Sequence, residues 1–144
     1  MSCDKNFDLT VVTDATFSEN TKACGISAVL LDECGQPRLA LGRRVVNASS
    51  NEEGELRAIL FALEEIPNDN MSVLIQSDNQ NAVLYLNDES HTGENGMRYV
   101  RKIRNRIQQK NLNVTFVWQS RIHNDIADAV AAFSTKSDVW ARLK

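Results

Sequence analysis

The spacing of apolar residues changes near residue 50, and this change limits the chain to folds that combine strands with helices. Before it, apolar and polar residues alternate, as in the run FDLTVVTDAT from residue 7, which is typical of a half-buried strand. After it, Leu56, Ile59 and Leu63 follow one another at helical spacing. The sequence therefore predicts an α/β fold.

Signals along the whole chain give the element order β-β-β-α-β-α-α-β-α. Three strands with short connections favour an antiparallel meander, and strands that alternate with helices later in the chain indicate parallel pairing. We therefore expect a five-stranded mixed sheet with helices on both faces, in a single domain spanning residues 1–144. The expected strands cover residues 7–13, 25–32, 37–46, 71–78 and 113–118, and the expected helices cover 51–66, 79–87, 97–110 and a last segment from near 124 to past 133.

Composition limits the compartment and the partners of the chain. Its 144 residues are 42% hydrophobic and 24% charged, as in ordinary globular proteins, and the net charge of −3 gives no overall basic signature for nucleic acid. The first residues, MSCDKNFD, lack the apolar core of a signal peptide, and no apolar run is long enough to span a membrane. The 3 cysteines show no CxxC spacing, which argues against a disulfide framework or a zinc site. We expect a cytoplasmic monomer.

Three acidic residues stand out among the 19 Asp and Glu because of their places in the predicted elements. Asp14 closes the first strand and Asp78 closes the strand VLIQSD, and the carboxyl ends of parallel strands meet at the sheet edge where α/β sheets place their sites. Glu55 lies in the first turns of its helix, in line with Ile59 and Ala62 at helical spacing, so it faces at least partly inward. Capping of a turn, or stabilisation of the helix dipole, remains open for each acid alone.

The last helix carries two further acids, three residues apart, in the run NDIADAVAA. Asp125 follows a predicted N-cap at Asn124, where a carboxylate stabilises the helix dipole by about 0.3–1 kcal/mol. Asp128 lies on the side of small residues that permit close packing. Spacing alone leaves the choice between the two acids open, because both share a face. The small residues are Ala131 and Ala132, and the expected inward apolar stripe is Ile126, Val130 and Phe133.

If Asp128 joins Asp14, Glu55 and Asp78, the four carboxylates repel one another, and bound cations are needed to offset this repulsion. Without cations, the pKa values of the carboxylates rise. Ligands that are all oxygen select Mg²⁺ or Mn²⁺ over zinc. A cluster of this kind can hold two metals about 3.5–4 Å apart, one activating a water and the other stabilising the leaving oxygen of a phosphoryl displacement. The cluster therefore predicts a phosphodiesterase.

A basic helix face is a candidate for substrate contact. Between Arg98 and Lys110 there are 6 basic residues and no acidic one, and they lie off the expected apolar stripe of Met97, Val100, Ile103 and Ile107. Such a face can hold a nucleic-acid backbone with salt-dependent affinity, although a solvated helix surface gives the same pattern. Arg43, Arg44 and Arg121 are further candidates. Asn51 can read a ribose 2′-hydroxyl, which distinguishes RNA from DNA, and Trp118 is expected to pack at a strand end.

Five blocks, in order, resemble the type 1 ribonuclease H family over residues 7–133. LTVVTDAT resembles the first strand with its first catalytic Asp, which assigns Asp14, and GISAVLLDECG resembles the second strand and its hairpin. SSNEEGELRAILFAL resembles the helix start T-N-x-x-x-E-L-x-A, which assigns Glu55, and VLIQSDNQNAV resembles the strand-then-Asp block, which assigns Asp78. WQSRIHNDIADAVA resembles W-x-x-R-x-x-N-x-x-A-D-x-L-A, which selects Asp128 rather than Asp125.

The resemblance implies a five-stranded mixed sheet and Mg²⁺-dependent endonucleolytic cleavage of the RNA strand in RNA–DNA hybrids, leaving 3′-hydroxyl and 5′-phosphate ends. It implies two Mg²⁺ ions, with Mn²⁺ as the alternative, held by the four acids. The substrate contacts that we expect are Asn51, Asn79, Arg101, Arg104, Arg121 and Asn124.

Several positions depart from the family pattern. Asn79 stands where Ser is usual, Glu52 stands where a substrate-contacting Asn is common, and Ala15-Thr16 follow the first Asp where many members have Gly-Ser or Gly-Ala. The G-H-x-G loop before the last helix is missing, as in the plant and archaeal subgroup and in retroelement-derived domains. His123 could replace the His of that loop, although an exposed His beside a helix start has the same pattern.

Three other interpretations remain open. A non-catalytic nucleic-acid-binding domain on the same fold would not need all four acids, so their presence argues against it. Another nuclease on this fold, such as an exonuclease or a junction resolvase, is disfavoured by the E-L-x-A and N-x-x-A-D blocks. An unrelated α/β protein with ordinary surface acids would show no stabilisation by divalent metal.

Overall fold

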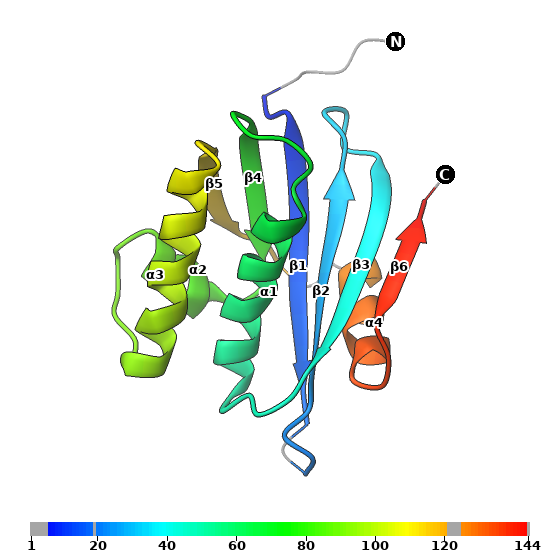
Figure 1. Cartoon of the computed structure of the whole chain (residues 1–144), viewed down its shortest axis with the longest axis vertical. Helices are drawn as coiled ribbons and strands as arrows, with labels where there is room; N and C mark the ends of the chain where they lie inside the picture. Colours follow the sequence, from blue (N-terminus) through cyan, green and yellow to red (C-terminus); the bar gives the residue numbers. More distant parts are fainter. Residues whose placement is uncertain (1–5, 19, 121–124, 144) are drawn as a thin grey trace.

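The computed structural model describes residues 6–18, 20–120 and 125–143, and these form one mixed sheet with helices on both faces (Figure 1). Arg121, His123 and Asn124 lie outside the described residues. The strands are β1 (Leu9–Phe17), β2 (Cys24–Leu31), β3 (Pro37–Val45), β4 (Ser72–Ser77), β5 (Asn113–Trp118) and β6 (Val139–Arg142). The helices are α1 (Asn51–Glu65), α2 (Gln80–Leu86), α3 (Glu94–Gln109) and α4 (Asp125–Ser134).

The sheet has the strand order β5-β4-β1-β2-β3-β6. β1, β2 and β3 form the expected antiparallel meander, and β4 and β5 run parallel to β1 as expected. The prediction of five strands was wrong by one, because β6 pairs antiparallel with β3 at the other edge. β6 spans only 4 residues, which is too short for an alternating pattern to stand out from a loop.

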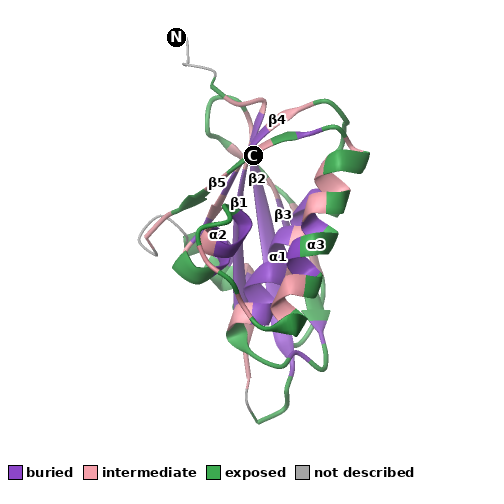
Figure 2. Cartoon of the chain, turned by 90° about the vertical axis from the view of Figure 1, so that its left-hand side faces the viewer, coloured by how far each residue is buried: buried purple, intermediate pink, exposed green. Residues whose placement is uncertain are grey.

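The helices cover the two faces unequally (Figures 1 and 2). α1 packs on β1 and β2, and α3 packs on α1 as an outer layer, while α4 packs on β1, β2 and β3 from the opposite face. The larger part of the core lies on the α1 side. The smaller cluster on the α4 side consists of Val12, Val29, Ala40 and Ala127. No helix within the described residues is long and apolar enough to cross a membrane.

A side-chain cap marks the start of α1. The Oγ of Ser50 accepts a hydrogen bond from the backbone N–H of Glu53 at 3.1 Å, which satisfies one of the free N–H groups of the first turn. The Glu53 carboxylate accepts bonds from the N–H and the Oγ of Ser49, at 3.3 and 2.9 Å. The cap fixes where α1 begins, and the apolar face that follows packs on the sheet with Glu55 among its buried side chains, 1% exposed.

The inward face of α4 differs from the prediction. Ile126 and Phe133 are 43% and 59% exposed, whereas Ala127 and Ala131 are buried. The cause lies in the sheet, because a Cβ added at Gly25 would overlap the carbonyl oxygen of Ala131. The backbone of α4 therefore approaches the sheet closely, and only its small side chains fit between.

Other boundaries and one cysteine also differ from the expectations. α3 begins at Glu94 rather than at residue 97, and its expected inward stripe is confirmed by the full burial of Val100 and Ile103. Cys24 is free and buried, whereas Cys34 is disulfide-bonded, which the cysteine spacing did not predict.

Candidate metal centre

The site is built where β4 ends and β1 continues. Thr13 of β1 pairs with Ser77 of β4 in parallel register, so the next residues along the two chains, Asp14 and Asp78, emerge side by side. Asp14 does not close its strand as predicted, because β1 runs on to Phe17 and Asp14 pairs with Ser27 of β2. The predicted neighbourhood of the two acids is nevertheless present.

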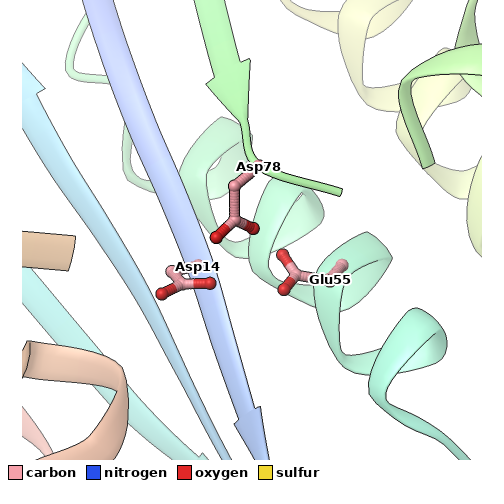
Figure 3. A group of neighbouring side chains, drawn as sticks. All are labelled: Asp14, Glu55 and Asp78. Atoms are coloured by element: carbon pink, nitrogen blue, oxygen red, sulfur yellow. The ribbon is translucent and has the colours of Figure 1, made fainter. Parts of the chain in front are cut away.

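Glu55 completes a cluster of three carboxylates (Figure 3). One oxygen of Asp14, one of Glu55 and one of Asp78 lie within 4.8 Å of one another. Asp14 and Glu55 are buried, at 0% and 1% exposure, and Asp78 is partly buried. The three side chains come from a strand, a helix and a strand end, so the folded framework holds them together.

Burial and charge repulsion raise the pKa values of the two buried carboxylates, Asp14 and Glu55. The pKa of Asp14 rises from 3.8 to about 7, first because burial removes water from the carboxylate, and then because of the charge of Asp78. A hydrogen bond of 2.9 Å from the N–H of Ala15 to Oδ1 of Asp14 acts in the opposite direction. The pKa of Glu55 is raised well above its usual value by burial and by the charges of Asp14 and Asp78.

Two oxygens of the cluster fit a bound cation. Oδ2 of Asp14 and Oε2 of Glu55 are buried and accept no hydrogen bond from the described part of the chain. Buried acceptors without a partner cost free energy, and a ligand set that is all carboxylate suits a hard divalent ion. The cluster can therefore bind a divalent metal.

Asp128 approaches the cluster from the other face of the sheet. It is exposed on α4, and its hydrogen bond and its charge both contribute to the raised pKa of Asp14. It is not one of the three residues whose oxygens lie within 4.8 Å of one another. Asp125, one turn earlier, is also exposed, so α4 brings Asp128 next to Asp14 without burying it.

The predicted substrate contacts lie in varied surroundings. Asn51 is exposed at the start of α1. Asn79 is the N-cap of α2, and its Oδ1 accepts from the N–H of Ala82 at 2.8 Å. Arg101 and Arg104 of α3 form exposed ion pairs, at 2.8 Å with Glu94 and 2.6 Å with Asp88. Arg121 and Asn124 lie outside the described residues.

Two neighbours of the site have contacts that sequence reasoning missed. Trp118 was expected to pack, yet it is 50% exposed, and its Nε1–H donates to the backbone carbonyl of Asp78 at 3.2 Å. The feature that accounts for this contact is the parallel register of β4 and β5. It places Trp118 opposite Ser77, the residue before Asp78. Glu52 accepts hydrogen bonds from the Oγ1 of Thr92, at 3.3 Å, and from the Tyr85 hydroxyl, so it ties the start of α1 to the neighbouring loop.

Several solved structures share this fold. RNase H1 from the halophilic archaeon Halobacterium salinarum is 20% identical, with a TM-score of 0.78 over 88% of this chain and 96% of that chain. LC11-RNase H1, in complex with RNA/DNA hybrid, is 21% identical, with a TM-score of 0.80 over 88% and 96%. The N-terminal RNase H domain of a Mycobacterium tuberculosis protein is 13% identical, with a TM-score of 0.77 over 92% and 96%. No curated protein matches the chain by sequence.

Sequence identities this low show only a shared fold, and a family model shows to which family the chain belongs. The model described as reverse transcriptase-like matches residues 12–134, which includes every described acid of the cluster. Its match and the shared fold agree with the resemblance to type 1 ribonuclease H, and the acidic cluster fits a nuclease. The chain belongs to the reverse transcriptase-like family and has the ribonuclease H fold.

Proposed function

We propose that the chain is a metal-dependent endoribonuclease that cleaves the RNA strand of RNA–DNA hybrids. The observation that carries this proposal is the convergence of Asp14, Glu55 and Asp78, with two buried oxygens that accept no hydrogen bond from the described residues. The complex of LC11-RNase H1 with RNA/DNA hybrid supports the choice of substrate class.

The metal ligands in this proposal are Asp14, Glu55 and Asp78, with Asp128 as the fourth carboxylate. Two Mg²⁺ ions are the proposed cofactor, with Mn²⁺ as the alternative, because hard oxygen ligands prefer these ions. When bound, they would supply the positive charge that activates a water and stabilises the leaving oxygen of the phosphodiester. The products would carry 3′-hydroxyl and 5′-phosphate ends.

The chain itself positions the ligands. Pairing of Asp14 with Ser27 of β2 holds its backbone in the sheet, and the packing of α1 on β1 and β2 holds Glu55 in the interior. The indole of Trp118 holds the carbonyl of Asp78. Ligands that are fixed before substrate arrives need no reorganisation during the reaction.

The proposed substrate contacts come from several elements. Asn51, which is exposed at the start of α1, is proposed to meet a ribose 2′-hydroxyl. The ion pairs of Arg101 and Arg104 are exposed, and exposed pairs contribute little stability, so both side chains can exchange a carboxylate for a phosphate. Asn79 keeps its amide NH₂ for the substrate while its Oδ1 caps α2, and Arg121 and Asn124 remain candidates from the sequence.

One experiment separates the proposed function from the alternatives. The protein is incubated with three labelled substrates, which are RNA–DNA hybrid, double-stranded RNA and double-stranded DNA. Each reaction contains either Mg²⁺ or a chelator, and the series is repeated with the Asp78→Asn variant. We expect cleavage of the hybrid alone, only with Mg²⁺, and a loss of at least about a hundredfold in the variant. Binding of the hybrid without cleavage would identify a non-catalytic domain, and cleavage of another duplex would identify a different nuclease.

A further inference from the structure

Four cations gather on two aromatic rings away from the acidic cluster. The guanidinium of Arg43, on β3, lies 4.5 Å from the centre of the Phe61 ring. The ring of Tyr99, on α3, has three cations around it. They are Arg57 at 5.5 Å, Arg98 at 5.1 Å and Lys102 at 5.3 Å.

The two rings hold these cations without neutralising them. Phe61 and Tyr99 are anchored in the core, at 5% and 7% exposure. The face of an aromatic ring attracts a cation through its quadrupole and carries no net charge. A guanidinium or ammonium on a ring therefore keeps its full charge, and only acidic neighbours can offset it.

The cations line a continuous depression. A hollow of about 200 Å³ lies between the sheet, α1 and α3, and its lining includes Arg43, Arg57 and Lys102. A second hollow, of about 370 Å³, lies between α1 and α3 and includes Lys102 and Arg106. Because both are lined by Leu60 and Lys102, they form one surface. We call the surface made by the lining cations Arg43, Arg57, Lys102 and Arg106 the basic groove, and we include Arg98, which shares the ring of Tyr99 with Arg57 and Lys102.

Acidic residues offset only part of this charge. Glu64 lines both hollows. Glu65 forms an exposed pair with Arg43 at 3.7 Å, and Glu53 pairs with Arg57 at 3.6 Å. Five cations therefore face three acids, and no ion pair among the described residues engages Lys102. The groove is positive on a chain whose net charge is −3.

The basic groove lies on the other side of α1 from the acidic cluster. Glu55 and Arg57 are two residues apart, and two residues turn an α-helix by about 200°. Glu55 is buried against the sheet, while Arg57 lies against Tyr99 of the outer helix α3. A ligand in the groove is therefore separate from a phosphodiester held at the carboxylates.

We propose that the basic groove binds the phosphate backbone of single-stranded nucleic acid. It would be a second site, on the other side of α1 from the acidic cluster. Three of its cations are arginines on or beside the rings, and the planar edge of a guanidinium fits phosphate oxygens. The two hollows measure only about 200 and 370 Å³, so the groove suits one phosphate backbone rather than a whole duplex. The choice of nucleic acid over an acidic peptide rests on the proposed function.

The test measures binding of labelled oligodeoxythymidine to Asp78→Asn protein by fluorescence anisotropy over a range of salt concentrations. This probe contains no RNA, so its binding is independent of hybrid cleavage. The double variant Arg43→Gln/Lys102→Gln removes two exposed cations of the groove. We expect weaker binding and a slope of log affinity against log salt that is shallower by about 1.4, since each phosphate contact on a single strand contributes about 0.7.

The matched control is Arg142→Gln/Lys136→Gln, which removes the same charge elsewhere and includes an Arg held over an aromatic ring, Trp140. It should bind as the unaltered chain does. The charge-preserving variant Arg43→Lys/Lys102→Arg should restore the binding, which separates charge from folding. Equal loss in the groove and control variants, or no loss in either, overturns the proposal. Competition by polyglutamate as strong as by unlabelled oligodeoxythymidine overturns nucleic acid as the ligand.

Discussion

The buried carboxylates of Asp14 and Glu55 lie together between β1 and α1, and each keeps one oxygen without a hydrogen-bond partner among the described residues (Figure 3). Without a cation, their repulsion costs stability. Asp14→Asn removes one charge and adds an amide that can donate to the neighbouring carboxylates. We expect the midpoint of thermal unfolding in chelator to rise by several degrees, at about 2–4 °C per kcal/mol for a chain of this size.

The same variant should lose most of the rise in midpoint that Mg²⁺ or Mn²⁺ gives to the unaltered chain, because a cation that binds the folded state stabilises it by mass action. Scanning calorimetry with chelator and with each metal measures both effects. Asp125→Asn, which removes the same charge from an exposed position, is the control. An equal metal response in the two variants would contradict the assignment of Asp14 as a ligand.

The raised pKa of Asp14 makes the stability of the metal-free protein depend on pH. Its carboxyl has a pKa of about 7 in the folded chain and 3.8 as the ordinary value, so the folded state binds the proton more tightly. This contribution to the free energy of unfolding is complete below pH 3.8 and is lost as the pH rises towards about 7. Urea denaturation in chelator at several pH values measures it. The loss should be smaller in Asp14→Asn, and parallel pH profiles of the two proteins would rule out this origin.

The two acids of α4 should differ in their effects on catalysis. Asp128 acts on Asp14 through a hydrogen bond and its charge, whereas Asp125 stands at the exposed start of the helix. We expect Asp128→Asn to lower Mg²⁺-dependent cleavage of hybrid by at least about tenfold, and Asp125→Asn to change it less than about twofold. Cleavage rates under substrate saturation give the comparison, and equal rates would remove Asp128 from the site.

The bond from the Trp118 indole to the carbonyl of Asp78 should matter more for activity than for stability. Trp118→Phe keeps an aromatic ring and removes the donor at 3.2 Å. A neutral hydrogen bond contributes about 0.5–1.5 kcal/mol, so we expect only a small change in the free energy of unfolding. The rate at saturating substrate should fall several-fold, because the backbone that carries Asp78 loses its anchor. A loss of stability without a change in rate would show that the contact is only structural.

Close packing of α4 on the sheet makes Gly25 intolerant of a side chain. A Cβ there would meet the backbone of Ala131, Ser134 and Thr135, and overpacking of this kind costs about 1–3 kcal/mol or more. Gly25→Ala should therefore lower the free energy of unfolding by at least that amount in denaturant titrations. Gly93→Ala is the control, because a Cβ at Gly93 meets no atom within 4 Å, and it should cost little.

Local pattern was sufficient for the elements whose packing follows hydrophobic periodicity. The helix predicted over 51–66 runs over Asn51–Glu65, because its cap and its apolar spacing agree. β1 was predicted too short, since Asp14, Ala15 and Thr16 form no alternating apolar pattern. They are strand residues because β2 pairs with them, and no local signal carries that long-range pairing.

The inward face of α4 was predicted wrongly for a different reason. Large apolar residues favour burial, but at this interface the glycines of β2 and β3 draw the helix so close that alanine and serine fill the contact. The side of α4 that is buried therefore depends on the surface of the sheet, and the sequence of α4 alone does not predict it. The choice of Asp128 over Asp125 likewise came from the family pattern, because helical spacing left both acids on one face.

The buried apolar face of α1 fixes the rotation of this helix against the sheet, since Leu56, Ile59 and Leu63 are fully buried. A rotation of α1 by one residue position would turn all its side chains by about 100°. Glu55 would then leave the interior, and Arg57 would leave the ring of Tyr99 in the same movement. The acidic side of α1 and its cationic side are therefore mechanically linked, because one rigid helix carries both.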